Sequence, residues 1–381
     1  MTAPTDEPRR PRSRLRRWAL VAAALVGGAV AVSAASTQGF ASFGGKLDGA
    51  RLERARRSPQ FDGKKFVNPL PTQTLVPGTF WQMVRHQIFG REQRVPPSPP
   101  PVIARSTADY RTPPASGLRA TWIGHATVLL EIDGARLLTD PIWSERASPS
   151  TLVGPRRFHP PPITLEALPP VDVVVIFHDH FDHLDMATVR ALARRGTRFA
   201  VPLGVGAHLE SWGIPAGQIL ELDWGESATV AGLTLTATPA RHYSGRNPLR
   251  AYRTLWASWV VRSPGHRVFF SGDTGYFDAF VRIGEQHGPF DLTLLKIGAC
   301  DPTWQLIHMS PEEAVRVHQD VRGRLLLPVH WGTFALAFHA WNQPAEAVSA
   351  AAAAQGVALA IPRPGEWVDV AAPPVLQPWW R

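Results

Sequence analysis

The chain has 381 residues, 44% of them hydrophobic and 19% charged, which is typical of a folded protein and excludes a disordered one. Its single cysteine, Cys300, excludes an intramolecular disulfide framework and a cysteine-rich zinc site, and we expect a small core residue there rather than a nucleophile. The formal net charge of +9 is uneven, because residues 1–17 contain six arginines against two acidic residues. A basic head before an apolar run indicates membrane targeting and argues against a nucleic-acid partner.

Residues 18–36 form the apolar segment that follows this basic head. No charged side chain occurs between Arg17 and Lys46, so the uncharged stretch exceeds the roughly 20 residues that a membrane-spanning helix needs. The segment is either a signal peptide cleaved near Ser33 or an uncleaved signal anchor, and its length and loose cleavage signal favour the anchor. Both interpretations predict a catalytic body on the non-cytoplasmic side of a membrane, which is the periplasm in a Gram-negative cell.

Residues 37–117 are expected to form an N-terminal extension. Residues 46–57 have a helical composition, and residues 96–101 are rich in proline and predict a stiff, extended connector. Between them, a short helix would place four apolar side chains on one face: Phe80, Trp81, Val84 and Ile88. The pattern favours packing of this face on the core, and its aromatic and arginine content also permits an interfacial helix that rests on lipid.

The main domain is expected to span residues 118–381, where short β-strands dominate. Strands are predicted at residues 120–123, 128–132, 136–139, 173–176, 197–201, 228–237, 257–262, 267–270, 292–295 and 324–329. Helices are predicted at residues 187–195, 276–286, 311–321 and 344–354. Strand-rich hairpins mixed with a few helices indicate an α+β fold in which two sheets pack together with helices outside them.

Directly after the predicted strand 173–176, nine residues contain three imidazoles and several carboxylates. Their spacing, His-x-His-x-Asp-His, lets one turn gather nitrogen and oxygen donors from His178, His180, Asp182 and His183. A catalytic zinc ion usually takes only three protein ligands and a water, so this cluster offers more donors than one ion needs. The spacing therefore suggests two metal ions that are completed by ligands from elsewhere.

Three further stretches offer those ligands. His242, Asp273 and His330 each follow a predicted strand, and Asp273 lies in a turn flanked by glycines. Because all three residues come at the carboxyl ends of strands, they could point into one cleft. Alone, His242 or His330 would more often be an ordinary core or surface histidine, but their shared position after strands favours a metal centre.

The order HxHxDH, then His, Asp and His, resembles the metallo-β-lactamase superfamily. More specific motifs resemble its branch of N-acylphosphatidylethanolamine-hydrolysing phospholipase D enzymes: residues 121–131 (TWIGHATVLLE), 138–150 (LTDPIWSERASPS), 154–158 (GPRRF), 270–276 (FSGDTGY) and 330–337 (HWGTFALA). The similarity extends from about residue 58 to about residue 370. It implies an αββα sandwich with two zinc ions that cleaves a phosphodiester, while Phe177 and Asp179 depart from the family pattern and Asp179 adds a charge near the metals.

Carried over residue by residue, the resemblance implies that one zinc ion binds His178, His180 and His242. The second ion would bind Asp182, His183 and His330, and Asp273 would bridge both ions. A water shared by two such ions is held as hydroxide at neutral pH and can attack phosphorus.

Three residues are assigned to catalysis itself: Asp182, Asp273 and His308. His308 matches a histidine that the resembled family places beside the substrate phosphate, where it would bind an oxygen or protonate the leaving group. The alternative for His308 is a surface histidine beside a helix. His125 and Asp140 are either groups that orient the metal ligands through hydrogen bonds or purely structural residues.

The leading hypothesis is therefore a membrane-tethered or exported hydrolase with two Zn²⁺ per chain. It would cleave a phosphodiester in a phospholipid such as N-acylphosphatidylethanolamine and would not bind nucleic acid. Two alternatives remain open. The same site could act on a lactone, a cyclic nucleotide, RNA or another ester, or the chain could be a non-catalytic binding module of the cell envelope. The sequence predicts no oligomeric state.

Overall fold

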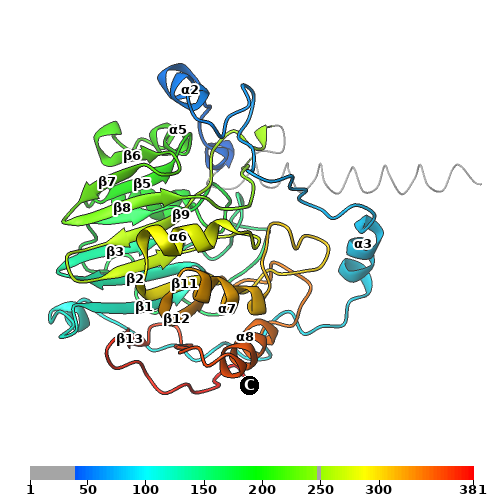
Figure 1. Cartoon of the computed structure of the whole chain (residues 1–381), viewed down its shortest axis with the longest axis vertical. Helices are drawn as coiled ribbons and strands as arrows, with labels where there is room; N and C mark the ends of the chain where they lie inside the picture. The colour runs from blue at the N-terminus through cyan, green and yellow to red at the C-terminus, as the bar shows by residue number, and fades with distance from the viewer. Residues whose placement is uncertain (1–38, 247–249) are drawn as a thin grey trace, which may run out of the picture.

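The computed structural model describes residues 39–246 and 250–381, and two β-sheets packed face to face form its centre (Figure 1). Helices cover both outer faces, which confirms the predicted two-sheet sandwich. Within the described ranges, no helix combines the length and the apolar character needed to cross a bilayer. The apolar segment 18–36 lies outside those ranges, so its assignment as an anchor or a signal peptide stays a prediction.

The first sheet has seven strands in the order β13-β1-β2-β3-β4-β5-β6. Its bounds are β1 Leu118–Gly124, β2 Thr127–Ile132, β3 Ala135–Thr139, β4 Val173–Val175, β5 Arg198–Pro202, β6 Ile219–Leu222 and β13 Trp367–Asp369. Strands β1 to β3 form an antiparallel meander, and β3 to β6 run parallel. The sequence did not predict β6 or β13, which are short.

The second sheet has six strands in the order β12-β11-β10-β9-β8-β7. Its bounds are β7 Ser227–Val230, β8 Leu233–Thr238, β9 Ser258–Arg262, β10 Arg267–Phe270, β11 Phe290–Lys296 and β12 Gly323–Val329. The prediction of one strand over residues 228–237 is wrong, because a hairpin divides this stretch into β7 and β8. Its two turn residues, Ala231 and Gly232, both have positive φ, as a tight hairpin of this handedness requires.

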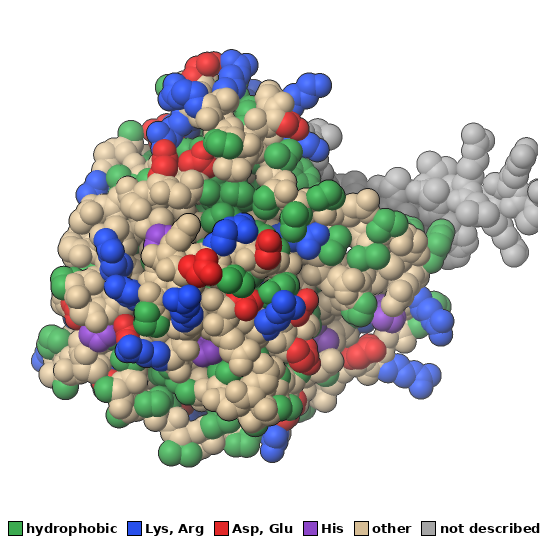
Figure 2. Space-filling view, in the orientation of Figure 1, with side chains coloured by type: hydrophobic (Ala, Val, Ile, Leu, Met, Phe, Trp, Pro, Cys, Tyr) green, Lys and Arg blue, Asp and Glu red, His purple; other side chains and the backbone are tan. Residues whose placement is uncertain are grey.

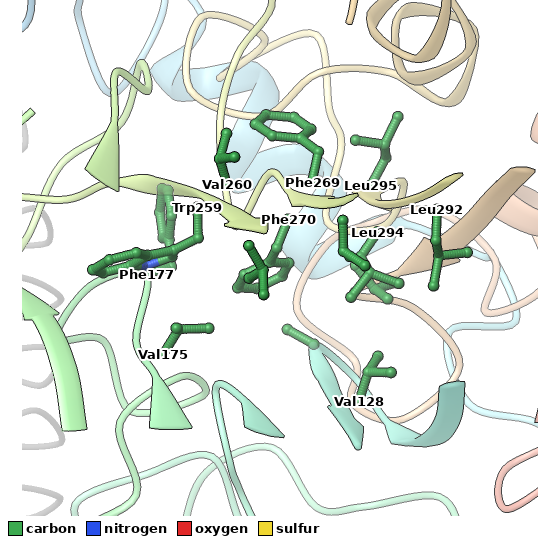
Figure 3. Close-up of a cluster of buried hydrophobic side chains, with 14 of the residues drawn as sticks. Val128, Val175, Phe177, Trp259, Val260, Phe269, Phe270, Leu292, Leu294 and Leu295 are labelled. Atoms are coloured by element: carbon green, nitrogen blue, oxygen red, sulfur yellow. The ribbon is translucent and has the colours of Figure 1, made fainter. Parts of the chain in front are cut away.

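The main core lies between the two sheets. Trp259, Phe270 and Leu294 are neighbours in register across β9, β10 and β11, and Figure 3 shows them pointing toward Val128 and Val175 of the first sheet. All five side chains are fully buried. Their sequence neighbours Val260, Phe269 and Leu295 point to the opposite face, as the two-residue period of a strand requires. Strands β9, β10 and β11 are therefore buried on both faces at this level.

Five helices complete the outer layers. Helices α4 (Met186–Ala193) and α5 (Gly206–Ser211) pack on the first sheet, and α6 (Ala279–His287), α7 (Pro311–Asp320) and α8 (Gln343–Ala354) pack beside the second. Helix α7 begins with a capping box in which Ser310 and Glu313 each bond the other's backbone N–H. This cap fixes the chain directly after His308, so the fold positions that residue firmly.

The N-terminal extension packs against the main domain over most of its described length. It contains η1 (Gly39–Phe43), α2 (Gly49–Arg56), α3 (Phe80–Phe89) and η2 (Thr107–Tyr110), and Phe66 and Tyr110 are buried. Helix α3 is the exception, because it lies at the edge of the molecule and has no buried residue (Figure 1). The preferred prediction that its apolar face packs on the core is therefore wrong.

Candidate metal centre

The loop that follows β4 carries four of the seven expected ligands. Its start is fixed by Phe177, whose backbone N–H donates to Asp140 Oδ1 at 2.7 Å. Its end is fixed by Asp185, which caps α4 by accepting from the backbone N–H of Ala187. Between these points the buried guanidinium of Arg246 donates to the carbonyls of Asp179 and Leu184. The loop is therefore braced at both ends and across its middle.

The second sheet delivers the other three ligands to the same place. His242 follows β8, Asp273 follows β10 and His330 follows β12. Strands β10, β11 and β12 are parallel, and β8 runs in the same direction because both β8 and β10 are antiparallel to β9. All three residues therefore reach one edge of this sheet, opposite the loop after β4.

The structure brings all seven residues into one cluster. The ligand atoms of His178, His180 and His242 lie within 4.8 Å of one another, as the expected first set requires. The expected second set is equally close, and His125 joins it: His125, Asp182, His183 and His330. Its shared partner is Asp182, whose Oδ2 lies 3.0 Å from His125 Nε2 and 3.3 Å from both His183 Nε2 and His330 Nε2.

Asp273 lies between the two sets. Its Oδ1 is 3.0 Å from His330 Nε2, and its Oδ2 is 3.3 Å from His183 Nε2 and 3.9 Å from His242 Nε2. One carboxylate therefore faces ligands of both expected ions. Gly272 allows this approach: its φ is +55°, and a Cβ at this position would lie 1.9 Å from the Phe177 ring.

Several polar atoms at the centre of the cluster have no hydrogen-bond partner in the protein. The Nε2 atoms of His183 and His242 and both ring nitrogens of His178 are buried without a hydrogen bond. Burying such atoms unpaired costs free energy, so their convergence calls for a ligand that several nitrogens can share. Imidazole and carboxylate donors at this density fit divalent cations such as zinc.

The charges of the site favour a cation as well. Burial lowers the pKa of His242 to about 3 and that of His178 well below its ordinary value, so both rings are neutral and able to bind a metal at neutral pH. Burial acts in the same direction on His183, but the neighbouring carboxylates, led by Asp182, outweigh it and raise the pKa of His183 well above the usual range. The site thus has a negative field that attracts a positive charge.

Hydrogen bonds outside the cluster orient two of the expected ligand rings, those of His183 and His242. His183 Nδ1 lies 2.6 Å from Asp140 Oδ2, and both residues are fully buried. His242 Nδ1 lies 2.9 Å from the carbonyl of Ile307, and its backbone is held by the side-chain amide of Asn68. Metal-bound imidazoles commonly have such partners. The sequence anticipated Asp140 but missed Asn68, which comes from the extension and has no local signal of metal chemistry.

His308 lies beside the cluster and not at the free surface. Its Nδ1 is 3.9 Å from Asp273 Oδ2, and its ring centroid is 5.0 Å from that of His242. It lines a cavity of about 430 Å³ together with His86 of α3 and Cys300. Cys300 was expected in the core, but it is half-buried on the wall of this cavity. Burial lowers the pKa of His308 well below its ordinary value and raises that of the Cys300 thiol.

Two charged side chains near the cluster behave in ways that the sequence did not indicate. Asp179 points away from the metal ligands, because its carboxylate accepts from Gly245 N–H and contacts His208 Nε2 at 3.2 Å. Burial opposes its charge, but the contact with His208 outweighs this and the pKa of Asp179 falls to about 2. Lys296 is fully buried at the end of β11, donates to the carbonyl of Met309 and has a pKa lowered to about 8 by burial.

Known proteins are similar to this chain in sequence and in fold. Residues 135–331 match the family model of the beta-lactamase superfamily domain. An uncharacterised protein of Mycobacterium tuberculosis is 50% identical over 337 residues, covering 86% of this chain and 88% of the relative. The N-acyl-phosphatidylethanolamine-hydrolyzing phospholipase D 1 of Caenorhabditis elegans is 38% identical over 296 residues, covering 72% of this chain and 83% of the relative. The solved structure of a metallo hydrolase from Ignicoccus hospitalis is 26% identical in sequence with a TM-score of 0.52, and the match covers 66% of this chain and 97% of that one.

Proposed function

The chain belongs to the metallo-β-lactamase superfamily of metal-dependent hydrolases, and from this premise we propose that it is a two-zinc phosphodiesterase that cleaves a phospholipid. The observation that carries the proposal is the meeting of seven donor residues in one buried cluster with His308 and a cavity beside them. We assign His178, His180 and His242 to one ion, Asp182, His183 and His330 to the second, and Asp273 to both.

Two divalent cations at this site would lower the pKa of a water, supply a nucleophile at neutral pH and neutralise charge on a phosphate. The chain's own residues would fix the geometry for this chemistry. The Asp140 carboxylate accepts from His183 Nδ1–H, which leaves the lone pair of His183 Nε2 facing the cluster. We assign His308 to a phosphate oxygen, because burial keeps its ring neutral and a neutral imidazole has one N–H to donate.

A lipid substrate is supported by one relative and by one surface. The Caenorhabditis elegans relative is named for hydrolysis of N-acylphosphatidylethanolamine, which makes this lipid the first candidate here. Helix α3, whose His86 lines the cavity beside His308, exposes four large apolar side chains to solvent: Phe80, Trp81, Ile88 and Phe89. Exposed apolar and arginine side chains on one short helix suit a lipid interface.

Nucleic acid is a poor partner for the face of the molecule that Figure 2 shows. On the face shown in Figure 2, Lys and Arg side chains are interspersed with acidic ones and form no continuous basic stripe. Binding to phosphate backbones would require such a stripe.

We propose that the basic residues 1–17 and the apolar residues 18–36 direct the chain to a membrane, with the catalytic domain from residue 118 onward on the non-cytoplasmic side. Intact-mass measurement of membrane and soluble fractions tests whether residues 18–36 are cleaved.

Metal analysis coupled to a phosphodiesterase assay tests the function. The full-length protein is analysed for zinc and assayed on bis-p-nitrophenyl phosphate and on vesicles of N-acylphosphatidylethanolamine, before and after dialysis against a chelator. We expect about two zinc ions per chain, cleavage that chelation abolishes and zinc restores, and higher activity on the lipid. The His180→Ala/Asp273→Ala variant should lose both metal and activity, whereas Asp133→Ala/His266→Ala, at a partly exposed Asp–His pair outside the ligand cluster, should lose neither.

Each contrary result points elsewhere. Bound metal without phosphodiester cleavage would refute the substrate class and direct the search to lactones and thioesters. A protein that neither contains nor takes up zinc would refute the metal centre and favour a binding module. Full activity of the His180→Ala/Asp273→Ala variant would refute the mechanism.

A further inference from the structure

His330 differs from His183, the other histidine assigned to the second metal site, in what orients its ring. Its Nε2 faces the cluster, 3.0 Å from Asp273 Oδ1 and 3.3 Å from Asp182 Oδ2. Its Nδ1 is buried without a hydrogen-bond partner, whereas the Nδ1 of His183 has Asp140. A ligand imidazole normally relies on such a partner to fix its orientation. Something else must therefore hold His330.

The residue that follows His330 lies in a stack of tryptophans. Trp331 is 3% exposed, and its ring lies 5.5 Å from that of Trp122, nearly parallel at 11°, and 5.2 Å from that of Trp379 at 29°. Trp380 meets the same ring edge-on, with centroids 6.0 Å apart at 87°. Trp331 is therefore enclosed by Trp122 from β1 and by Trp379 and Trp380 from the last residues of the sequence.

Residues 379–381 are themselves tied to other elements. Trp379 Nε1 donates to the carbonyl of Ile361, and Trp380 Nε1 donates to Glu346 Oε1 on α8 at 2.9 Å. Arg381 makes two further bonds to the Glu346 carboxylate, at 2.8 and 2.9 Å. These contacts fix the two indoles against Trp331, so the stack is a rigid support and not a loose surface patch.

The stack also shares a backbone acceptor with the ligand. The carbonyl of His125 accepts both from Trp122 Nε1 and from the backbone N–H of His330, each at 2.9 Å. His330 itself has a φ of +63°, a left-handed conformation that costs free energy for a residue with a side chain and persists only where its surroundings impose it. The stacked Trp331 and the shared carbonyl impose this conformation from both sides.

We propose that Trp379 and Trp380 are positioning residues for the second metal site, acting through Trp331 to aim His330 at the ion. The indole stack takes the place of the hydrogen bond that His330 Nδ1 lacks. This inference rests on the two-metal assignment given above, and it adds that the affinity of one ion depends on residues far from the cluster in sequence.

The test is zinc binding by metal-free protein, measured by competition with a chelating dye and independent of any substrate. Wild-type protein should bind two equivalents. Trp379→Ala should weaken one equivalent by roughly 10- to 100-fold and leave the other unchanged, since the loss of a group that orients a ligand typically has this effect. Trp379→Phe, which keeps an aromatic ring in the stack, should restore most of the affinity. Glu346→Ala, which releases Trp380 and Arg381 from α8, should give a smaller loss of the same equivalent.

Trp367→Ala is the matched control, because it removes an indole from β13, which pairs with the β1 strand of Trp122. Trp367 stacks on Arg105 and Arg119 and not on Trp331. Its zinc affinities should match wild type. Unchanged affinities in folded Trp379→Ala would overturn the proposal, and so would equal weakening of both equivalents or an equal effect of Trp367→Ala. If Trp379→Ala does not fold, Glu346→Ala decides in the same way. Only one zinc ion bound by wild type would instead refute the two-metal assignment.

Discussion

Asp140→Asn removes a carboxylate from beneath the ligand His183 without changing the size of the side chain. Asp140 is fully buried, and its two oxygens have separate tasks: Oδ2 contacts His183 Nδ1 at 2.6 Å and Oδ1 accepts from Phe177 N–H at 2.7 Å. An asparagine has one acceptor and one NH₂ donor. If its oxygen serves Phe177, its NH₂ faces His183 Nδ1, which must then accept and leave the proton on Nε2. That is the nitrogen that points at Asp182 and Asp273.

The expected result is weaker zinc binding and slower hydrolysis. Substitutions of groups that orient metal ligands commonly cost 10- to 100-fold, which corresponds to about 1.4–2.7 kcal/mol. Zinc affinity is measured by competition titration, and activity by initial rates on bis-p-nitrophenyl phosphate over a range of zinc concentrations. Part of the lost rate should return at high zinc concentration, because the defect lies in occupancy and orientation and not in the reacting groups.

Asp133→Asn supplies the control for this experiment. Asp133 makes a comparable contact with His266 Nδ1 at 3.0 Å and also accepts from Ser263 and Gly265, but it lies outside the metal cluster and is partly exposed. Its zinc affinity and activity should equal those of wild type. Wild-type zinc affinity in Asp140→Asn would refute the reasoning, because the carboxylate would then have no part in presenting His183.

The other predictions concern the phosphate, the lipid surface and the pH dependence of stability. His308→Ala should lower kcat by roughly 10²-fold or more with zinc content unchanged, while His308→Gln, which retains an N–H donor, should keep activity within about tenfold; equal loss in both variants would indicate proton transfer instead. Trp81→Ser/Phe89→Ser on α3 should reduce binding to phospholipid vesicles and cleavage of vesicle substrate but not cleavage of bis-p-nitrophenyl phosphate, and unchanged vesicle binding would contradict a lipid-facing α3. Burial lowers the pKa of His318 to about 4, so the unfolded state binds the proton more tightly and stability present above pH 6.5 is lost as the pH falls toward 4. The unfolding free energy should drop by about 2 kcal/mol between pH 7 and 5 from this residue alone, and urea titrations of His318→Gln, which should lose this component, check it.

The sequence predicted which residues converge, because their position after strands is a local property. A run of β-branched residues followed by His, Asp or a glycine turn marks the carboxyl end of a strand, and strands that run in one direction bring these ends to one edge. His242, Asp273 and His330 could be placed together on that basis before any pairing was known. The same logic failed at Asn68 and Trp379. Asn68 bonds the backbone of His242 across 174 residues of sequence, and Trp379 stacks on Trp331 across 48 residues, so no local pattern specifies either contact.

Helix α3 shows a different limit. Its pattern correctly predicted a helix with an apolar stripe through Phe80 and Ile88, but periodicity reports only that a stripe exists and not which way it faces. Packing on the core and contact with lipid predict the same spacing. The placement of the helix at the edge of the molecule, with Trp81 and Phe89 exposed, excludes packing on the core, and contact with lipid stays a prediction.

Backbone conformation is the part of the site that side-chain patterns cannot reveal. His125, Asp140 and His330 have φ values of +54°, +33° and +63°, in the region that favours glycine. Each such residue costs of order 1–3 kcal/mol, and a glycine would remove the strain but also the imidazole or carboxylate that the cluster needs. The backbones of His125 and His330 are bonded to each other, because the carbonyl of His125 accepts from His330 N–H, and Asp140 fixes the start of the loop that carries His183. Backbone strain is therefore present where donors from both sheets must converge, and the buried sandwich beneath supplies the stability that sustains it.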